Sequence, residues 1–281
     1  KWKAKAENGG KALNTKTADG KTTIKDDANR TVAYMWTDKD NDGNTVSNKE
    51  FLTDYWRARA KANSNYENTY TLGMRGVHDG GFSTNMNSQT AMKEILETQT
   101  QILKDEVVKT GQDISDIPQV FIPYKEMLDM YKKGLEIPDY VTIMWPDDNF
   151  GYIRQLPTET ERQRSGGAGI YYHLSYYGRP TSYLWLSTTS PAQIREEMTK
   201  AYDMGAQKIW IANVGDLKPA ETEIEYFFDL ARDIDTIKNT EISDWLAENA
   251  KRDFAFDDVK AAEYSDIKMG YYKNTSSKRP E

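Results

Sequence analysis

Between residues 70 and 237 the sequence alternates short apolar runs with amphipathic segments, and a glycine or an acidic turn separates most of them. The short runs have the length and β-branched content of buried strands, whereas the longer segments repeat apolar residues at helical spacing. Strands are predicted at 70–72, 119–122, 141–146, 169–178, 182–187 and 208–212. Helices are predicted at 87–110, 124–134, 191–202 and around 224–231. Alternation of this kind indicates a parallel sheet with crossover helices.

The polar residues of this region cluster directly after the predicted strands. That pattern is typical of an α/β fold of the (β/α)8 TIM type, a barrel whose active site lies at the carboxyl ends of its strands. The segments present supply about five or six strands, fewer than the eight of a complete barrel. We therefore expect an N-terminally truncated barrel whose first strands precede Lys1. A doubly wound open sheet is the alternative, although no G-x-G-x-x-G motif follows an early strand.

The segments on either side of the alternating region differ from it in pattern. Residues 1–65 are polar and contain several glycines, so we expect an irregular and helical lead-in that belongs to the barrel domain. Residues 66–238 are expected to form the main part of the barrel. Residues 239–281 show helical patterns only, at 242–254 and 259–272, and are expected to begin an α-helical domain.

The composition excludes several classes of function. The formal net charge of -7 argues against nucleic acid and an anionic membrane surface as partners, and no apolar run approaches the length of a transmembrane helix. The absence of cysteine excludes disulfides and thiolate chemistry. Two histidines are too few for a His-rich zinc site, so neither a metal nor a cofactor is expected.

One short segment raises calcium as an alternative. Asp38-Lys-Asp40-Asn-Asp42-Gly43 resembles the opening of an EF-hand loop. The bidentate glutamate of such a loop would fall at Lys49, and Glu50 comes one residue late. An Asx-rich turn before a helix explains the same residues, and we favour that interpretation.

The run Val141–Pro146 delivers two adjacent carboxylates, Asp147 and Asp148, to the end of a predicted buried strand. In α/β folds, acids at that end of a strand commonly belong to an active site. Because neighbouring side chains of an extended chain point to opposite sides, we expect one carboxylate to face the site and the other to bind backbone or a cation. The alternative is a solvated loop after a core strand.

Five motifs, taken in order along the chain, resemble glycoside hydrolase family 115. They are Leu72-Gly-Met-Arg-Gly-Val-His-Asp79, Tyr124-Lys-Glu126, Asp147-Asp-Asn-Phe-Gly-Tyr-Ile-Arg154, Gly166-Gly-Ala-Gly-Ile-Tyr-Tyr-His173 and Asn213-Val-Gly-Asp-Leu-Lys-Pro219. The resemblance covers roughly residues 66–235. It implies a xylan α-1,2-glucuronidase that removes (4-O-methyl-)glucuronic acid side chains from glucuronoxylan with inversion, on a (β/α)8 barrel followed by a helical domain.

The chain departs from the family pattern in two respects. A His-Glu-Pro-Met motif and a glutamate thought to matter for catalysis would lie upstream of Lys1. Position 175 is Ser, where some members carry an acidic residue. A barrel that binds carbohydrate without cleaving it is therefore one alternative function, and an inactive fragment of the enzyme is another.

Inverting hydrolysis needs one carboxylic acid to protonate the leaving oxygen and a second carboxylate to deprotonate a water. We predict that Asp147 and Asp148 supply one of these groups, with Asp216 as partner. Asp79, Glu126 and the upstream glutamate remain alternatives for the partner. Each has a structural alternative too: Asp216 as a helix cap, Glu126 as a first-turn partner of a helix dipole and Asp79 as a loop anchor.

A planar guanidinium recognises a carboxylate through two parallel hydrogen bonds, so Arg75, Arg154 and Arg179 are candidates for binding the uronic acid. At least one of them is expected to pair with a neighbouring acid instead. His78 and His173 are candidates for binding sugar hydroxyls, with a core position as the alternative. The other predicted substrate-binding residues are Asp79, Glu126, Asn149, Tyr152, Tyr172 and Asn213. The tyrosines, Tyr177 included, either stack on a pyranose or fill the core.

These inferences set the expected partners and location. The partner is a xylan polysaccharide or oligosaccharide, and a homodimer is a further expectation. Because the polymer is outside the cell, a periplasmic or secreted protein is expected, with a signal that this chain does not carry.

Overall fold

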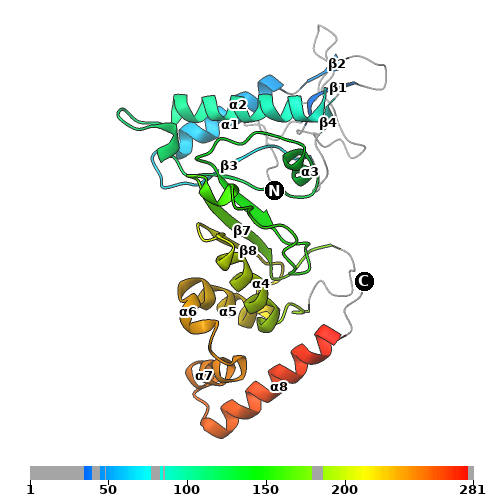
Figure 1. Ribbon diagram of the computed structural model, residues 1–281, viewed down its shortest axis with the longest axis vertical. Helices are drawn as coiled ribbons and strands as arrows, with labels where there is room; N and C mark the ends of the chain where they lie inside the picture. Colours follow the sequence, from blue (N-terminus) through cyan, green and yellow to red (C-terminus); the bar gives the residue numbers. More distant parts are fainter. Residues whose placement is uncertain are drawn as a thin grey trace, which may run out of the picture. The chain divides into compact units, whose positions relative to one another are not determined.

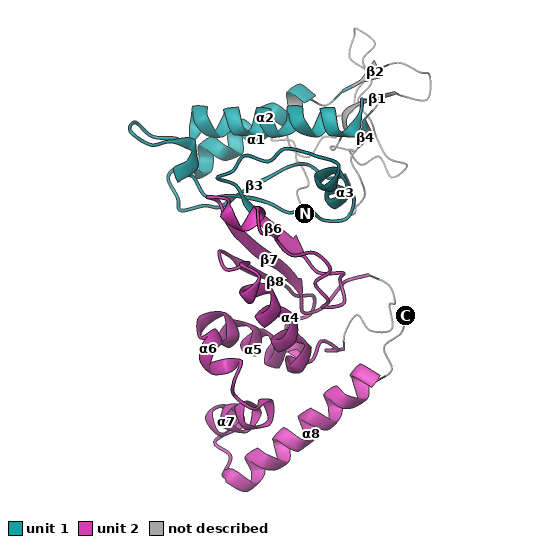
Figure 2. Ribbon diagram, viewed as in Figure 1, with its two compact units in different colours: residues 1–142 teal, residues 143–281 magenta. Residues whose placement is uncertain are grey.

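The computed structural model describes residues 35–39, 45–47, 49–76, 83–84, 86–178 and 186–277. The chain divides into two compact units, residues 1–142 and residues 143–281 (Figure 2). Within the described ranges, no helix combines the length and apolar character that crossing a bilayer requires.

In the first unit, two helices pack against each other beside a pair of parallel strands. The helices are α1 (Lys49–Asn63) and α2 (Ser88–Glu106), and the strands are β3 (Tyr70–Leu72) and β5 (Gln119–Phe121) (Figure 1). The side chain of Asn87 caps α2 by accepting hydrogen bonds from two amides of its first turn. The buried residues of α2 repeat at helical spacing: Ala91, Met92, Ile95, Leu96, Gln99, Ile102 and Leu103.

The chain leaves β3 through Gly73, which adopts a left-handed φ of 99°. The Gln99 side chain holds this residue at both backbone groups, accepting from the Gly73 amide at 2.8 Å and donating to its carbonyl at 3.1 Å. A Cβ at this position would lie 3.3 Å from the ring of Phe121. Packing and hydrogen bonds therefore fix the direction in which the chain runs toward Arg75.

The remaining elements of the first unit are short. Between α2 and β5 lies the 3₁₀ turn η2 (Ile114–Asp116), and α3 (Glu126–Lys132) follows β5. A separate sheet has the order β2-β1-β4, from β1 (Met35–Lys39), β2 (Thr45–Val46) and β4 (Ser83–Thr84). The lead-in was expected to be irregular and helical, so β1 and β2 were not predicted, because Met-Trp-Thr-Asp-Lys of β1 is too short and mixed to show alternation. Most of the calcium-loop segment, residues 40–44, lies outside the described residues.

The second unit is built on three parallel strands, β6 (Thr142–Pro146), β7 (Ala168–His173) and β8 (Trp210–Asn213). Every residue of β6 is buried, as expected for a parallel strand covered on both faces. Gly169 on β7 allows a close approach, because a Cβ there would lie 2.2 Å from the Ile209 carbonyl oxygen and 2.6 Å from the Met144 sulfur. The strand predicted at 169–178 ends at His173, where the chain turns into a loop.

Helices cover these strands. The helix α4 (Pro191–Asp203) is capped by Ser190, and α5 (Glu221–Arg232) follows the 3₁₀ turn η5 (Lys218–Ala220). Another 3₁₀ turn, η3 (Glu161–Gln163), lies between β6 and β7. The core between helix and sheet is aromatic: the Phe227 ring of α5 stacks on Tyr172 with a centroid separation of 6.0 Å and lies 5.9 Å from Trp210.

The helical tail contains α7 (Ile242–Phe254) and α8 (Asp258–Ser277), which are close to the two predicted helices, and the short α6 (Ile234–Ile237), which was not predicted, precedes them. Trp245 of α7 packs edge-on against Tyr226 of α5, with ring centroids 4.9 Å apart. Tyr272 of α8 donates its hydroxyl to the buried Glu223 of α5 at 2.5 Å. The tail therefore packs on the last helix of the parallel unit, and a separate helical domain is not evident in the described part of the chain.

The sequence pattern predicted the fold class correctly at the level of parallel α/β structure. Parallel pairing joins β3 with β5 in the first unit and β6, β7 and β8 in the second. A complete (β/α)8 barrel is not shown by the residues that the structure describes. The strand predicted at 182–187 falls mostly outside those residues.

Candidate functional site

The two aspartates after β6 have separate environments. The Asp147 side chain is fully buried, and its Oδ2 accepts hydrogen bonds from the amides of Gly151 at 2.9 Å and His173 at 3.3 Å. Its Oδ1 lies 2.5 Å from Nδ1 of the His173 ring, which is also buried. We assign the shared proton to Nδ1, because an ionised carboxylate only accepts. Asp147 thus holds the orientation of the His173 ring.

Asp148 points away from this pair. Its Oδ1 accepts from the amides of Phe150 at 3.0 Å and Tyr152 at 3.2 Å, and its Oδ2 accepts from Nε of Arg154 at 3.0 Å. The Arg154 guanidinium also lies over the Tyr152 ring, 5.1 Å from its centroid. The Asp148 side chain keeps 24% exposure, in contrast to Asp147. Both carboxylates thus bind backbone amides, and that one of them faces a substrate stays a prediction.

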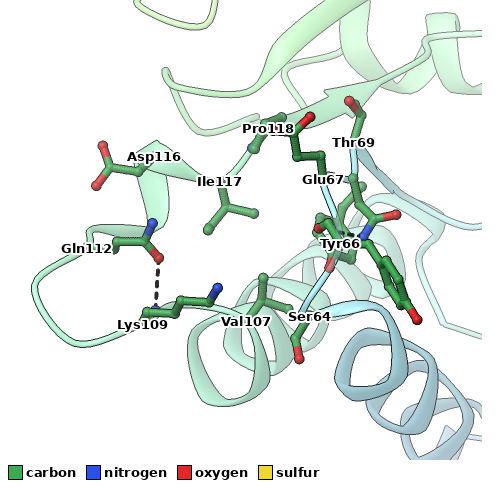
Figure 3. A pocket seen from close by; sticks show the side chains of 12 residues that line it. Ser64, Tyr66, Glu67, Thr69, Val107, Lys109, Gln112, Asp116, Ile117 and Pro118 are labelled. Carbon is green, nitrogen blue, oxygen red and sulfur yellow. Dashed lines mark hydrogen bonds between the residues drawn. The ribbon is translucent and has the colours of Figure 1, made fainter.

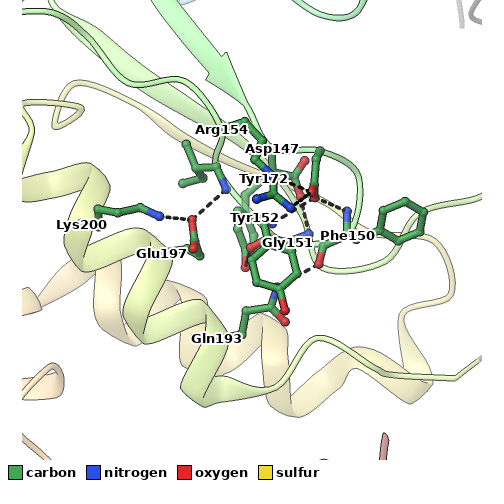
Figure 4. A network of polar contacts seen from close by, with 11 residues as sticks. Asp147, Phe150, Gly151, Tyr152, Arg154, Tyr172, Gln193, Glu197 and Lys200 are labelled. Atoms are coloured by element: carbon green, nitrogen blue, oxygen red, sulfur yellow. Dashed lines mark hydrogen bonds and ion pairs between the residues drawn. The ribbon is translucent and has the colours of Figure 1, made fainter. Parts of the chain in front are cut away.

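The turn that follows Asp148, with Phe150 and Gly151, is anchored to the core by side-chain hydrogen bonds (Figure 4). Gly151 has a φ of 84°, and its carbonyl accepts a hydrogen bond from the Tyr172 hydroxyl at 2.9 Å. The neighbouring Phe150 carbonyl accepts one from Nε2 of Gln193 on α4 at 2.9 Å. Tyr172 itself is buried within the core, as in the core-filling alternative for this residue.

Glu197 is a further anchor, and the sequence reasoning did not single it out. It lies on the inward face of α4, only 6% exposed, and its Oε2 accepts from the Ile153 amide at 2.7 Å and from Lys200 at 2.6 Å (Figure 4). The signal was available, because an acid falls in the apolar spacing of Ile194, Met198 and Ala201. A charged residue in such a stripe needs partners, which here include a backbone amide of the catalytic candidate loop.

The ends of β7 and β8 are joined by side-chain contacts. Asn213 donates its amide to the Tyr171 hydroxyl at 2.8 Å, and Ser175 accepts from the Gly215 amide at 2.5 Å. Ser175 therefore has a structural contact in this chain. Asp216 is exposed in the following loop, and the N-terminus of α5 has no side-chain cap, so the capping alternative for Asp216 is not observed.

In the first unit, Arg75 and Glu126 form a two-pronged ion pair after the carboxyl ends of β3 and β5. The Nε to Oε1 distance is 2.9 Å and the Nη2 to Oε2 distance is 3.0 Å. The Arg75 guanidinium lies 5.0 Å from the centroid of the Tyr124 ring. Glu126 is in the first turn of α3, and its side chain remains 29% exposed. Arg75 is thus one arginine that pairs with a neighbouring acid, as expected.

The other predicted site residues are placed as follows. Asn149 has a φ of 75° in the turn, and Tyr152 and Tyr177 are 39% and 76% exposed. His78, Asp79 and Arg179 lie outside the described residues. Among the residues that are described, no group of three or more His, Cys, Asp or Glu side chains is arranged to hold a metal ion.

Each unit contains groups suited to acid–base chemistry. In the first unit, the partly exposed Glu126 pairs with Arg75. In the second unit, the partly exposed Asp148 pairs with Arg154, and the buried Asp147 orients the His173 ring. A carboxyl group supplies or removes a proton during cleavage of a glycosidic bond, and a guanidinium binds an anionic substituent. The catalytic and binding roles of the individual residues remain predictions.

Comparisons with known proteins place these features in context. A family model described as Glycosyl hydrolase family 115 matches residues 25–281. A solved structure that the chain resembles is a family GH115 4-O-methyl-α-glucuronidase described as having specificity for decorated arabinogalactans. The identity is 43% and the TM-score 0.74, and the match covers 81% of this chain and 30% of that one. No match was found among curated proteins.

Proposed function

Because the chain belongs to glycosyl hydrolase family 115, we propose that the protein is a glycoside hydrolase acting on glucuronic acid side chains of a polysaccharide. The family resemblance inferred from the five motifs is confirmed by the family match. The chain spans 30% of the length of the similar α-glucuronidase. The activity is therefore proposed for the protein that contains this chain.

The proposed substrate is glucuronoxylan, from which the enzyme removes α-1,2-linked glucuronic acid or its 4-O-methyl ether with inversion. A second candidate polymer is a decorated arabinogalactan, which the description of the similar structure favours. Both polymers present the same anionic sugar, and they differ in the neutral backbone that carries it. Because both polymers are extracellular, we place the protein in the periplasm or outside the cell.

The observation that carries the proposal is the family match over residues 25–281, together with a partly exposed carboxylate, Asp148, directly after the buried strand β6. Burial sharpens the roles. Asp147 is closed off from solvent, so we propose that it is a positioning residue that orients the His173 ring at the end of β7. Asp148 is the acid of the adjacent pair with access to substrate, and Asp216, Glu126 or Asp79 supplies the second carboxyl group.

The test uses the intact protein with glucuronoxylan and with a uronic acid-decorated arabinogalactan. Released uronic acid is measured by anion-exchange chromatography, and ¹H NMR of the first-formed product reports its anomer. The β-anomer is expected, since inversion of an α-linkage produces it. We expect Asp148→Asn to lose most activity and Asp147→Asn to lose activity together with His173 orientation. Full activity in both variants would contradict the assignment.

The non-catalytic alternative has its own outcome in the same experiment. A protein that binds either polymer and releases no uronic acid would be a carbohydrate-binding barrel. The hydrogen bond from the Gly215 amide to the Ser175 hydroxyl is compatible with both the catalytic and the non-catalytic function, because it gives Ser175 a structural role in either case.

A further inference from the structure

A hollow of about 460 Å³ lies in the first unit, at the amino ends of β3 and β5 (Figure 3). One wall is the loop after α1, with Tyr66, Glu67 and Asn68, and the other wall is the segment after α2, with Lys109, Gln112 and Asp116. We refer to these residues as the polar hollow. The two walls meet where the Tyr70 amide donates to the Pro118 carbonyl at 2.9 Å.

The polar hollow is distinct from the acid-bearing ends of the strands. Arg75 and Glu126 follow the carboxyl ends of β3 and β5, whereas the hollow precedes the amino ends of the same strands. A strand of three residues separates the two ends by about 10 Å. A ligand in the hollow therefore contacts neither member of the Arg75–Glu126 pair.

The local structure prepares the walls for a ligand. The side-chain amide of Asn68 donates to the backbone carbonyls of Asn63 at 2.7 Å and Tyr66 at 2.9 Å. These hydrogen bonds hold the loop after α1 in place. On the opposite wall, the Gln112 side chain accepts from the Lys109 amide at 3.0 Å. Hydrogen bonds of this kind reduce the entropy that a ligand must remove on binding.

The lining has the character of a sugar-binding surface. Val107 and Ile117 give an apolar floor, and the Tyr66 ring, 72% exposed, stands at the rim as a surface for stacking on a pyranose. Amide, hydroxyl and carboxylate groups around it are donors and acceptors for sugar hydroxyls. The charged residues of the lining are Lys109, Glu67 and Asp116. Their net charge of -1 disfavours an anionic ligand.

We propose that the polar hollow binds a neutral sugar unit of the polysaccharide backbone, remote from the bond that is cleaved. The choice of a saccharide rests on the proposed function, whereas the charge of the lining selects the neutral backbone over the uronic acid side chain. Such a subsite would hold the polymer on the enzyme between successive cleavages.

Calorimetric titration of the intact protein with xylohexaose tests the proposal, with a β-galactohexaose as the probe for the alternative backbone. Neither probe carries uronic acid, so binding is measured without turnover. Tyr66→Ala should weaken binding of one probe about tenfold, the value of an aromatic contact. Tyr66→Phe keeps the ring and should bind as the native protein does. Both variants should retain the native thermal transition.

Three results would overturn the proposal: no binding of either probe, equal binding by native protein and Tyr66→Ala, or binding of glucuronic acid that Tyr66→Ala abolishes. Release of uronic acid from a short soluble oligosaccharide is measured in parallel and should be unchanged in Tyr66→Ala. Binding without release would contradict the proposed function alone, and release with no effect of Tyr66→Ala on binding would contradict the subsite alone.

Discussion

The loop after β6 and the polar hollow are both made by segments that connect strands and helices, yet they are held in different ways. In the loop, the buried carboxylates of Asp147 and Glu197 accept hydrogen bonds directly from backbone amides. In the hollow, the charged side chains are exposed to solvent. A hydrogen bond from the backbone amide of Tyr70 to the backbone carbonyl of Pro118 joins the two walls. Buried charges tolerate little displacement, which suits acid–base chemistry, whereas an exposed polar surface suits weak binding of a flexible polymer.

The largest effect is expected for Asp147→Asn. Asparagine replaces one carboxylate oxygen with an NH2 group, which cannot accept the hydrogen bonds that Gly151 and His173 donate. Buried hydrogen bonds are therefore lost, and the free energy of unfolding should fall by roughly 3 kcal/mol. Urea denaturation measures the loss. Asp148→Asn is the matched control and should cost less than about 1 kcal/mol, because its carboxylate is partly exposed. Equal losses in the two variants would remove the contrast between the aspartates.

Glu197→Ala should lower stability by about 2 kcal/mol, because it leaves the buried Ile153 amide without its acceptor. We expect kcat to fall more than KM changes, since the loop is displaced without loss of a substrate contact. Lys200→Ala is the control for the ion pair and should cost less than about 1 kcal/mol, because this lysine is 40% exposed. A kcat for Glu197→Ala equal to that of the native protein would show that the anchor does not position the loop.

Gly151→Ala and Gly111→Ala separate backbone strain from crowding. Both glycines have positive φ, 84° and 88°, but only at Gly151 does a new Cβ meet other atoms, 2.6 Å from Nε2 of Gln193 and 2.8 Å from the Tyr172 hydroxyl. We expect a loss of about 2 kcal/mol at Gly151 and about 1 kcal/mol at Gly111. Thermal unfolding compares them. The reverse order would mean that the loop after β6 adapts more readily than we infer.

The smallest effect expected is the pH dependence of stability that comes from Asp113, which is next to Gln112 of the hollow. The Ser115 amide and hydroxyl hold the pKa of Asp113 below its usual value. A depressed pKa in the folded state stabilises the protein above the unfolded pKa of about 3.9, and this contribution is lost as the pH falls through the folded value. The difference in melting temperature between native protein and Asp113→Ala should therefore shrink below about pH 4. A difference that stays constant from pH 7 to pH 3 would assign the effect to packing.

Local patterns were enough to predict most elements. The helices at Pro191–Asp203 and Ile242–Phe254 follow directly from a starting proline and from apolar spacing. Strand geometry also predicts that Asp147 and Asp148 lie in different environments, and their burial differs accordingly. The family resemblance supplied the function class, which alternation alone did not indicate.

What could not be predicted depends on contacts between distant parts of the sequence. The burial of Glu197 is set by the Ile153 amide, 44 positions away along the chain. The pairing of Arg75 with Glu126 likewise needs the two strands to lie side by side. The early strand β1 pairs with β4 across a gap of more than forty residues, and no local pattern encodes such a partner.

The contact between Tyr272 and Glu223 has a consequence for anyone who shortens this protein. Burial raises the pKa of the Tyr272 hydroxyl, which therefore remains a donor to a carboxylate that is only 1% exposed. A version that ends before α8 would remove the hydroxyl that donates to this carboxylate and would leave a buried acid without that hydrogen bond. A shortened version that is meant to keep α5 intact should therefore end after Tyr272.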